Sequence, residues 1–130
     1  MNADLYDFSP LAWLLLLGAL LAAVPLLALL WRHRHASPAR RRLALVSLTL
    51  FLTFDLVLFG AFTRLTDSGL GCPDWPGCYG QASPVGARAD IDAAQQAMPT
   101  GPVTHGKAWV EMIHRYLATG VGALILVLAV

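Results

Sequence analysis

The stretch Ala108–Val130, AWVEMIHRYLATGVGALILVLAV, is an apolar run that carries Glu111 and His114 near its beginning. Two further apolar runs, Leu11–Leu30 and Leu43–Phe62, have a similar length, close to the ~20 residues that a helix needs to cross about 30 Å of hydrocarbon. The chain is 57% hydrophobic and only 13% charged, which is too little polar surface to cover a soluble domain. The sequence therefore predicts an all-α membrane protein with three transmembrane helices.

The runs and the polar stretches between them divide the chain into six segments. We expect an outer N-terminal tail at 1–10, transmembrane helices at 11–31, 43–62 and 108–130, a basic loop at 32–42 and a long loop at 63–107. The first helix is expected to be retained rather than cleaved as a signal peptide, because Asp4 and Asp7 precede it where a signal peptide carries basic residues. Pro25 is expected to kink it. The third run is still apolar at Val130, so we expect the N-terminal part of a larger bundle.

Charge sets the expected orientation. The loop at 32–42 contains five arginines, and short loops rich in Lys and Arg stay in the cytoplasm. The same cluster could contact anionic lipid or nucleic acid, but between two spans it is far more often a topology determinant, and a net charge of +1 gives no reason to expect a nucleic-acid partner. The N-terminus and residues 63–107 are then predicted to lie outside.

The long loop contains both cysteines of the chain, in the sequence CPDWPGC at Cys72–Cys78. On the outer face of a bacterial membrane two such close thiols are expected to oxidise, and closing this loop should contribute about 2 to 2.5 kcal/mol in the chain-entropy model. A redox-active pair is the alternative, although catalytic thiol pairs more often have two intervening residues. A zinc site is less favoured because two more ligands would be needed.

Other residues of the loop give weaker signals. Arg64, just past the second span, could hold a carboxylate-bearing ligand at the membrane surface or contact lipid phosphate, and both interpretations stay open. Residues 90–98 are predicted to form a short surface helix with Ile91, Ala94 and Met98 on one side. His105 is expected to be a solvated interfacial residue.

Four ionisable side chains lie at membrane depth, where each costs several kcal/mol unless it is paired or hydrated. At 1.5 Å per residue, Asp55 is ~10 Å and His114 ~9 Å inside the outer ends of their helices. Glu111, His114 and Arg115 fall within one face of the third helix, which should therefore look into protein. A lone membrane histidine has a plain packing role about as often as a functional one, but a carboxylate one turn away favours function.

Three strings together carry a resemblance to a known family: GAFTRLTDSGLG at Gly60–Gly71, CPDWPGC at Cys72–Cys78, and EMIHR at Glu111–Arg115. They closely resemble haem A synthase of the proteobacterial type, over residues 43–130. The resemblance implies a multi-pass oxidoreductase of the bacterial inner membrane with about eight helices in two similar four-helix halves, each with a pair of histidines facing a haem pocket. This chain would supply an extra leading helix and two helices of the first half.

The resemblance also implies a reaction and its residues. Haem O would be oxidised at a ring methyl to the formyl group of haem A, for cytochrome c oxidase, with haem O in the first half and haem b in the second. His114 would be an axial ligand of the haem iron and Glu111 the acid beside it, and the two cysteines would form a disulfide. From charge and depth we add Arg64 and Arg115, as partners of haem propionates or of Asp55.

The implied partners are haem O synthase, cytochrome c oxidase assembly factors and membrane lipid. With one axial histidine, this segment alone is expected to be inactive. Two functions of other kinds remain as alternatives: a di-haem electron-transfer subunit, which also sets histidines on transmembrane helices, and a membrane thiol oxidoreductase, in which the cysteines would be the active pair.

Overall fold

The computed structural model describes residues 9–130, so most of the predicted N-terminal tail at 1–10 lies outside the described residues. The elements in chain order are α1 (Ser9–Arg32), α2 (Pro38–Leu65), α3 (Arg88–Ala97) and α4 (His105–Ala129). Helices α1, α2 and α4 are long and apolar enough to cross a membrane. No strand occurs within residues 9–130, and the predicted all-α membrane fold is confirmed.

The three long helices extend beyond the apolar runs that predicted them. Helix α2 begins at Pro38 because Ser37 caps it, its Oγ accepting a hydrogen bond from the Arg40 amide at 3.4 Å, and because proline suits the first helical position. Helix α2 ends at Leu65, so Arg64 lies in its last turn. The sequence had placed Arg64 just past the end of this span. Apolarity marks the part of a helix that lies in hydrocarbon, whereas its hydrogen bonding continues into polar residues.

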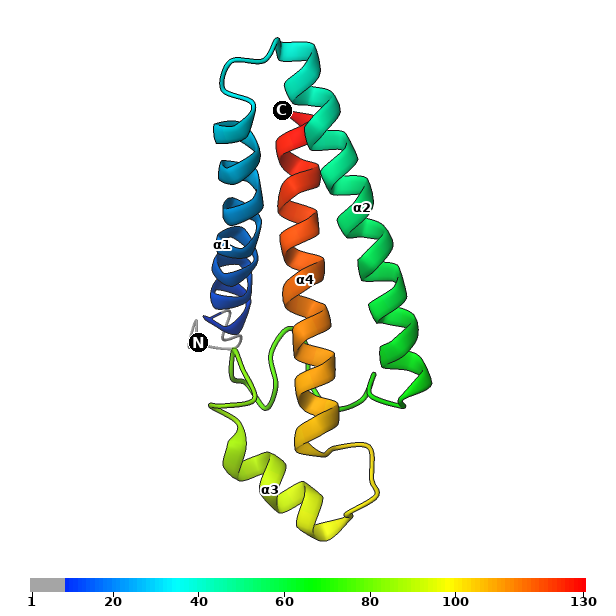
Figure 1. Ribbon diagram of the computed structural model, residues 1–130. Helices are drawn as coiled ribbons and strands as arrows, with labels where there is room; N and C mark the ends of the chain where they lie inside the picture. Colours follow the sequence, from blue (N-terminus) through cyan, green and yellow to red (C-terminus); the bar gives the residue numbers. More distant parts are fainter. Residues whose placement is uncertain (1–8) are drawn as a thin grey trace.

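Helix α4 lies between α1 and α2 (Figure 1). Its most extensive contacts are with α1, followed by those with α2, while α1 and α2 contact each other little. The short connection between α1 and α2 lies at one end of the bundle, and α3 lies with the long loop at the other (Figure 1). Helix α4 therefore forms most of the contacts that hold the three spans together.

The interface between α1 and α4 includes small residues at its closest approach. Buried Pro10, Leu14, Gly18 and Ala22 repeat every four positions, so they lie on one face of α1. A Cβ atom on Gly18 would lie 2.3 Å from Thr119 Cγ2, a separation that real atoms do not adopt. Only glycine lets the two backbones approach this closely, as is common where membrane helices pack together.

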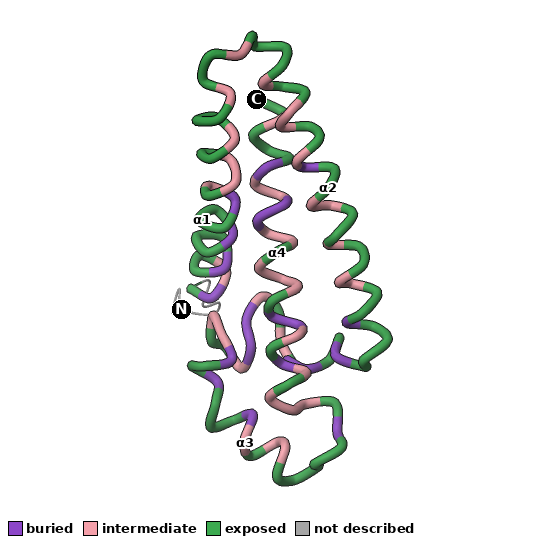
Figure 2. Tube along the Cα trace, viewed as in Figure 1, coloured by how far each residue is buried: buried purple, intermediate pink, exposed green. Residues whose placement is uncertain are grey.

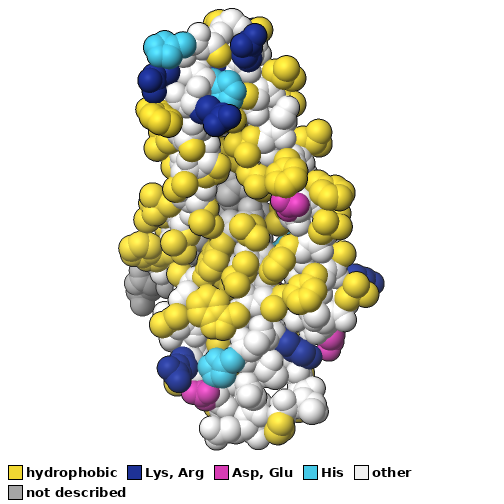
Figure 3. Space-filling model, in the orientation of Figure 1, with side chains coloured by type: hydrophobic (Ala, Val, Ile, Leu, Met, Phe, Trp, Pro, Cys, Tyr) yellow, Lys and Arg dark blue, Asp and Glu magenta, His cyan; other side chains and the backbone are white. Residues whose placement is uncertain are grey.

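The outer surface of the helices is apolar and their ends are charged. Figure 3 shows hydrophobic side chains over the middle of the molecule and Lys, Arg and His side chains gathered toward its two ends. The side of α1 away from α4 exposes large apolar side chains. Buried positions lie on α4, on the side of α1 that faces it, and in the loop region beside them (Figure 2). This distribution is expected when lipid, not water, covers the spans.

The main apolar cluster lies at the loop end and joins α1, the loop, α3 and α4. Its buried members are Leu14, Cys72, Cys78, Ala87, Ile91, Ala108 and Met112. The predicted short helix at 90–98 is found as α3, with Ile91 fully buried in this cluster. Met98, predicted to lie beside Ile91, instead follows the end of α3 and is exposed. Helix α3 therefore contributes Ile91 to the apolar cluster.

We predict that Gly18→Val weakens the contact between α1 and α4 and lowers the stability of the full-length protein by about 1 to 3 kcal/mol, because overpacking forces the helices apart. Thermal unfolding in detergent measures the effect. Gly122→Ala is the matched control, since a Cβ there meets no atom within 4 Å. Equal melting temperatures for the two variants would contradict the close packing of α1 on α4.

Candidate functional site

Arg115 and Glu111 hold the cysteine loop against α4. Arg115 Nη1 lies 3.0, 3.3 and 2.6 Å from the carbonyl oxygens of Asp74, Pro76 and Gly77. Its Nη2 forms an ion pair with Glu111, one turn earlier on the helix. The other carboxylate oxygen of Glu111 accepts a hydrogen bond from the Cys72 amide at 2.8 Å. The side chains of Arg115 and Glu111 are only 14% and 10% exposed, so these are largely buried, charge-assisted contacts.

Cys72 and Cys78 form a disulfide in the structure, as predicted, with their Cα atoms 4.9 Å apart. The loop is closed further by Asp74, whose carboxylate accepts hydrogen bonds from the amides of Tyr79 and Gly80. The two cysteines are 4% and 0% exposed. Thiol exchange requires access to a sulfur atom, so this burial favours the structural role over the redox alternative.

His114 points away from this loop and toward α2. Its ring stacks on that of Phe59, with centroids 6.0 Å apart and planes 10° from parallel. A Cβ atom on Gly60 would lie 3.0 Å from His114 Nε2, so the imidazole occupies space that a larger residue would fill. Within residues 9–130, no hydrogen bond joins His114 to any other residue. The His114 ring is held by packing and stacking alone. Its ring nitrogens are not used in a hydrogen bond to any residue in 9–130.

The expected single face of three ionisable residues is therefore divided between two environments. Glu111 and Arg115 lie four positions apart and both face the cysteine loop, whereas His114 faces α2. Consecutive residues of a helix diverge by ~100°, so His114 and Arg115 can meet different neighbours. No hydrogen bond links Glu111 to His114 in the described part of the chain.

His114 lines a pocket of about 500 Å³ that opens beside the end of α2. The pocket is lined by Gly60, Thr63, Arg64, Asp67, Gly69, Leu70 and His114. Lys107 Nζ lies 3.1 Å from Asp67 Oδ2, so that carboxylate is already paired. The Arg64 guanidinium makes no hydrogen bond or ion pair with any residue in 9–130. The pocket thus combines the His114 imidazole, which can ligate a metal, with the Arg64 guanidinium, which can pair with an anionic group.

The side chains available as ligands limit the kind of metal site that the His114 pocket can form. No group of three or more His, Cys, Asp or Glu side chains is arranged to hold a metal ion among the described residues. A single histidine suits a metal whose other ligands come from elsewhere, as when a porphyrin supplies the four equatorial nitrogens and protein supplies the axial one. The arrangement is compatible with an axial haem ligand and less so with a bare metal ion.

Two other sequence interpretations are changed by the structure. Neither Arg64 nor Arg115 forms an ion pair with Asp55, which lies on α2 and faces a separate apolar cavity. His105 is the first residue of α4, and its Nε2 is 2.6 Å from Asp92 Oδ1 on α3. It is therefore part of a contact between α3 and α4 and not only a solvated interfacial residue.

Sequence reasoning did not single out Phe59 and Gly60, which position the His114 ring. One signal was present: Gly60 precedes Arg64 by four residues, so both lie on the same face of α2. The facing residue of α4 could not be found in this way, because it depends on how the two helices are aligned along each other.

The fold and the site define a class: an all-α membrane protein in which a disulfide-closed loop is tied to one span. That span presents to a neighbouring helix a histidine that has no hydrogen-bond partner in the described part of the chain. Residues 43–130 match the COX15-CtaA family, described as cytochrome oxidase assembly protein. The chain belongs to this family. Helix α1 lies outside the matched residues.

Curated relatives agree with the family. The haem A synthase of Shewanella oneidensis is 49% identical over 82 residues, covering 63% of this chain and 25% of that protein. The haem A synthase of Rhizobium etli (strain CIAT 652) is 33% identical over 109 residues, covering 75% of this chain and 30% of that protein. This chain thus spans only about a quarter to a third of the length of these relatives. No solved structure matches the chain significantly.

We predict that Arg115→Ala destabilises the full-length protein by about 3 to 5 kcal/mol, because it leaves the buried Glu111 carboxylate without its partner. Thermal unfolding, together with the rate at which Cys72 and Cys78 become open to reduction and alkylation, measures the effect. Arg88→Ala is the matched control, since Arg88 is exposed and its side chain has no partner within residues 9–130. If both variants melt together and resist reduction equally, the proposed anchoring of the loop is wrong.

Proposed function

We propose that this chain is part of a haem A synthase, an oxidoreductase that converts a ring methyl of haem O to the formyl group of haem A for cytochrome c oxidase. The observation that carries the proposal is His114, an imidazole without a hydrogen-bond partner in the described residues, in a pocket with an unpaired arginine. Membership of the cytochrome oxidase assembly family and the relatives named haem A synthase support it.

The residues present fit a haem. His114 would be the axial ligand of the iron, and Gly60 leaves the room beside Nε2 that a side chain would take. Arg64, in the last turn of α2, would hold the haem propionates, because a guanidinium pairs well with carboxylates. The bound haem supplies both the substrate methyl group and the iron. The chain's contribution is to bind and orient the macrocycle.

Arg115 receives a different role from the one that charge and depth suggested. Its guanidinium already contacts Glu111 and three loop carbonyls, so binding a propionate would break contacts that hold the loop. We therefore propose that Arg115 positions the loop and that Arg64 alone binds propionate on this chain. Glu111 remains our candidate for the acid near the substrate: it lies one turn before His114 and is held by the Cys72 amide and Arg115.

The rest of the proposal concerns the protein's surroundings. We infer an inner-membrane location with the N-terminus and the cysteine loop on the periplasmic side, because the arginine-rich connection and the disulfide lie at opposite ends of the bundle (Figure 1). Haem b would be bound by the half of the protein outside this chain. Haem O synthase would supply the substrate, and oxidase assembly factors would receive the product.

We predict that His114→Ala abolishes haem A formation when the full-length protein is produced together with a haem O synthase. Chromatography of extracted haem is the measurement. His105→Ala is the control, because its imidazole contacts Asp92 and does not line the His114 pocket. An inserted wild-type protein that never yields haem A would exclude the synthase proposal, and wild-type yields from His114→Ala would remove only the ligand assignment.

Gly60→Val tests the space beside the imidazole. Its side chain would overlap His114, so we expect the purified full-length protein to retain less haem and to show an altered absorption spectrum. Gly106→Ala serves as control, since a Cβ there meets no atom within 4 Å. Unchanged haem content and spectrum in Gly60→Val would show that the ring does not sit against α2.

A further inference from the structure

The His114 pocket contains a carboxylate of its own beside the arginine that is available to an anionic group. Asp67 and Arg64 both line this pocket, and the Asp67 amide donates a hydrogen bond to the Arg64 carbonyl oxygen at 3.1 Å. Residues three positions apart at the end of a helix can bring their side chains together. An acid in this position could therefore neutralise the guanidinium that an anionic ligand needs.

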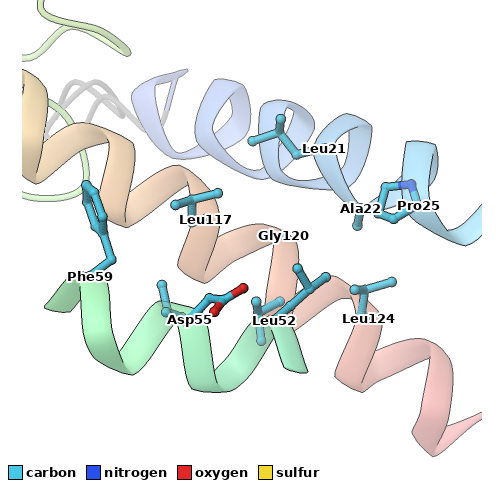
Figure 4. A pocket seen from close by; sticks show the side chains of 11 residues that line it. Leu21, Ala22, Pro25, Leu52, Asp55, Phe59, Leu117, Gly120 and Leu124 are labelled. Carbon is cyan, nitrogen blue, oxygen red and sulfur yellow. The ribbon is translucent and has the colours of Figure 1, made fainter. Parts of the chain in front are cut away.

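Among the described residues, Asp67 is the only acid that lines the His114 pocket. The other acid of α2 is Asp55, which lies nine positions before Arg64, or ~13 Å along the helix. Asp55 lines a different cavity, the apolar space of about 340 Å³ between α1, α2 and α4 (Figure 4). Asp67 is therefore the internal partner with which a ligand would compete for Arg64.

Lys107 pairs with this carboxylate instead. Its Nζ lies 3.1 Å from Asp67 Oδ2 and 3.2 Å from the carbonyl oxygen of Gly101. The Lys107 side chain is 22% exposed and the Asp67 side chain 89% exposed. An ion pair as open as this one adds little to stability, but it decides in which direction the Asp67 carboxylate points.

Both charges stand where the ends of their helices disfavour them. Asp67 follows Thr66, the C-cap of α2, and Lys107 lies in the first turn of α4. The helix dipole favours cations at a C-terminus and acids at an N-terminus, which is the reverse of this arrangement. Asp67 also has a φ of 52°, at the position after the C-cap where glycine is usual. Residues that break local rules in this way are expected at functional sites.

The backbone brings the two charges together before their side chains meet. A Cβ atom on Gly71 would lie 2.4 Å from the carbonyl carbon of Lys107, so the chain that follows Asp67 passes directly against the first turn of α4. The Lys107 amide donates a hydrogen bond to the Thr104 side chain, which caps α4. The ion pair is therefore placed by closely packed backbone and not by two free side chains alone.

We propose that Lys107 is a positioning residue of the His114 pocket, which keeps Arg64 free for a carboxylate of the ligand by pairing with Asp67. The inference rests on the proposed function and deepens it, because it gives the first turn of α4 a part in ligand affinity. Lys107 does not line the pocket, so it acts through Asp67 and not by touching the ligand.

A double-mutant cycle on the purified full-length protein tests this role. The probes are haem B, which carries two propionates, and its dimethyl ester, in which both carboxylates are masked. Absorbance titration gives each affinity, at the site whose spectrum is lost in His114→Ala.

Lys107→Met should weaken haem B binding about three- to five-fold, because the released Asp67 carboxylate competes for Arg64. Asp67→Asn should change haem B binding less than about two-fold, because the carboxylate is already sequestered in the wild type. The same substitution added to Lys107→Met should restore wild-type affinity. Binding of the dimethyl ester should not respond to any of these variants.

Two further variants serve as controls. Lys107→Arg keeps a cation for Asp67 and should bind haem B nearly as the wild type does. Arg88→Gln removes an exposed cation at the same end of the bundle, one that has no partner within residues 9–130 and does not line the His114 pocket. It should leave both affinities within about two-fold of the wild type.

Three results would overturn the assignment. Unchanged haem B affinity in Lys107→Met is the first. If Asp67→Asn weakens binding as much as Lys107→Met and the double variant is not restored, the pair is only a structural link between α2 and α4. If Asp67→Asn strengthens binding by the same factor with and without Lys107, only the total charge of the pocket matters.

Failure of the proposed function looks different from each of these results. The wild-type protein would then bind neither haem B nor its dimethyl ester with a spectrum that depends on His114.

Discussion

The contacts of Arg115 organise the end of the protein where its candidate site lies. One guanidinium joins the carboxylate of its own helix to three carbonyl oxygens of a loop about forty positions earlier in the chain. The Cys72 amide completes the connection through Glu111. These groups are buried or partly buried, so each would be costly alone and is satisfied when the loop is folded against α4. The disulfide keeps the loop in the shape that presents its carbonyls.

Because the loop is fixed on one side of α4, the opposite sides of the helix are free for other contacts. The small residues of α1 pack along it, and α2 approaches at the level of His114. The loop and the histidine are thus parts of one rigid arrangement without touching each other. Glu111 and His114 lie one turn apart on α4 and contact different neighbours, so a change in the Glu111 pair would reach His114 through the position of α4.

The two cavities extend this arrangement in opposite directions along α2. One is polar and lies near the end of the helix, with Arg64 and His114 in its lining. The other is apolar, deeper between the spans, and contains a single carboxyl group. The leading helix α1 completes the apolar part.

The sequence by itself determined the three spans, the disulfide pair, the short helix near residue 90 and the family, because hydrocarbon thickness and local motifs leave a direct record in the order of residues. It also indicated that His114 and Glu111 needed explanation, since ionisable groups are costly at membrane depth. Only the tertiary structure decided that Arg115 holds the loop, that His114 faces Gly60, and that Asp55 faces a cavity partly formed by α1. Those choices depend on how the helices are rotated and aligned, which is set by contacts between residues far apart in the chain.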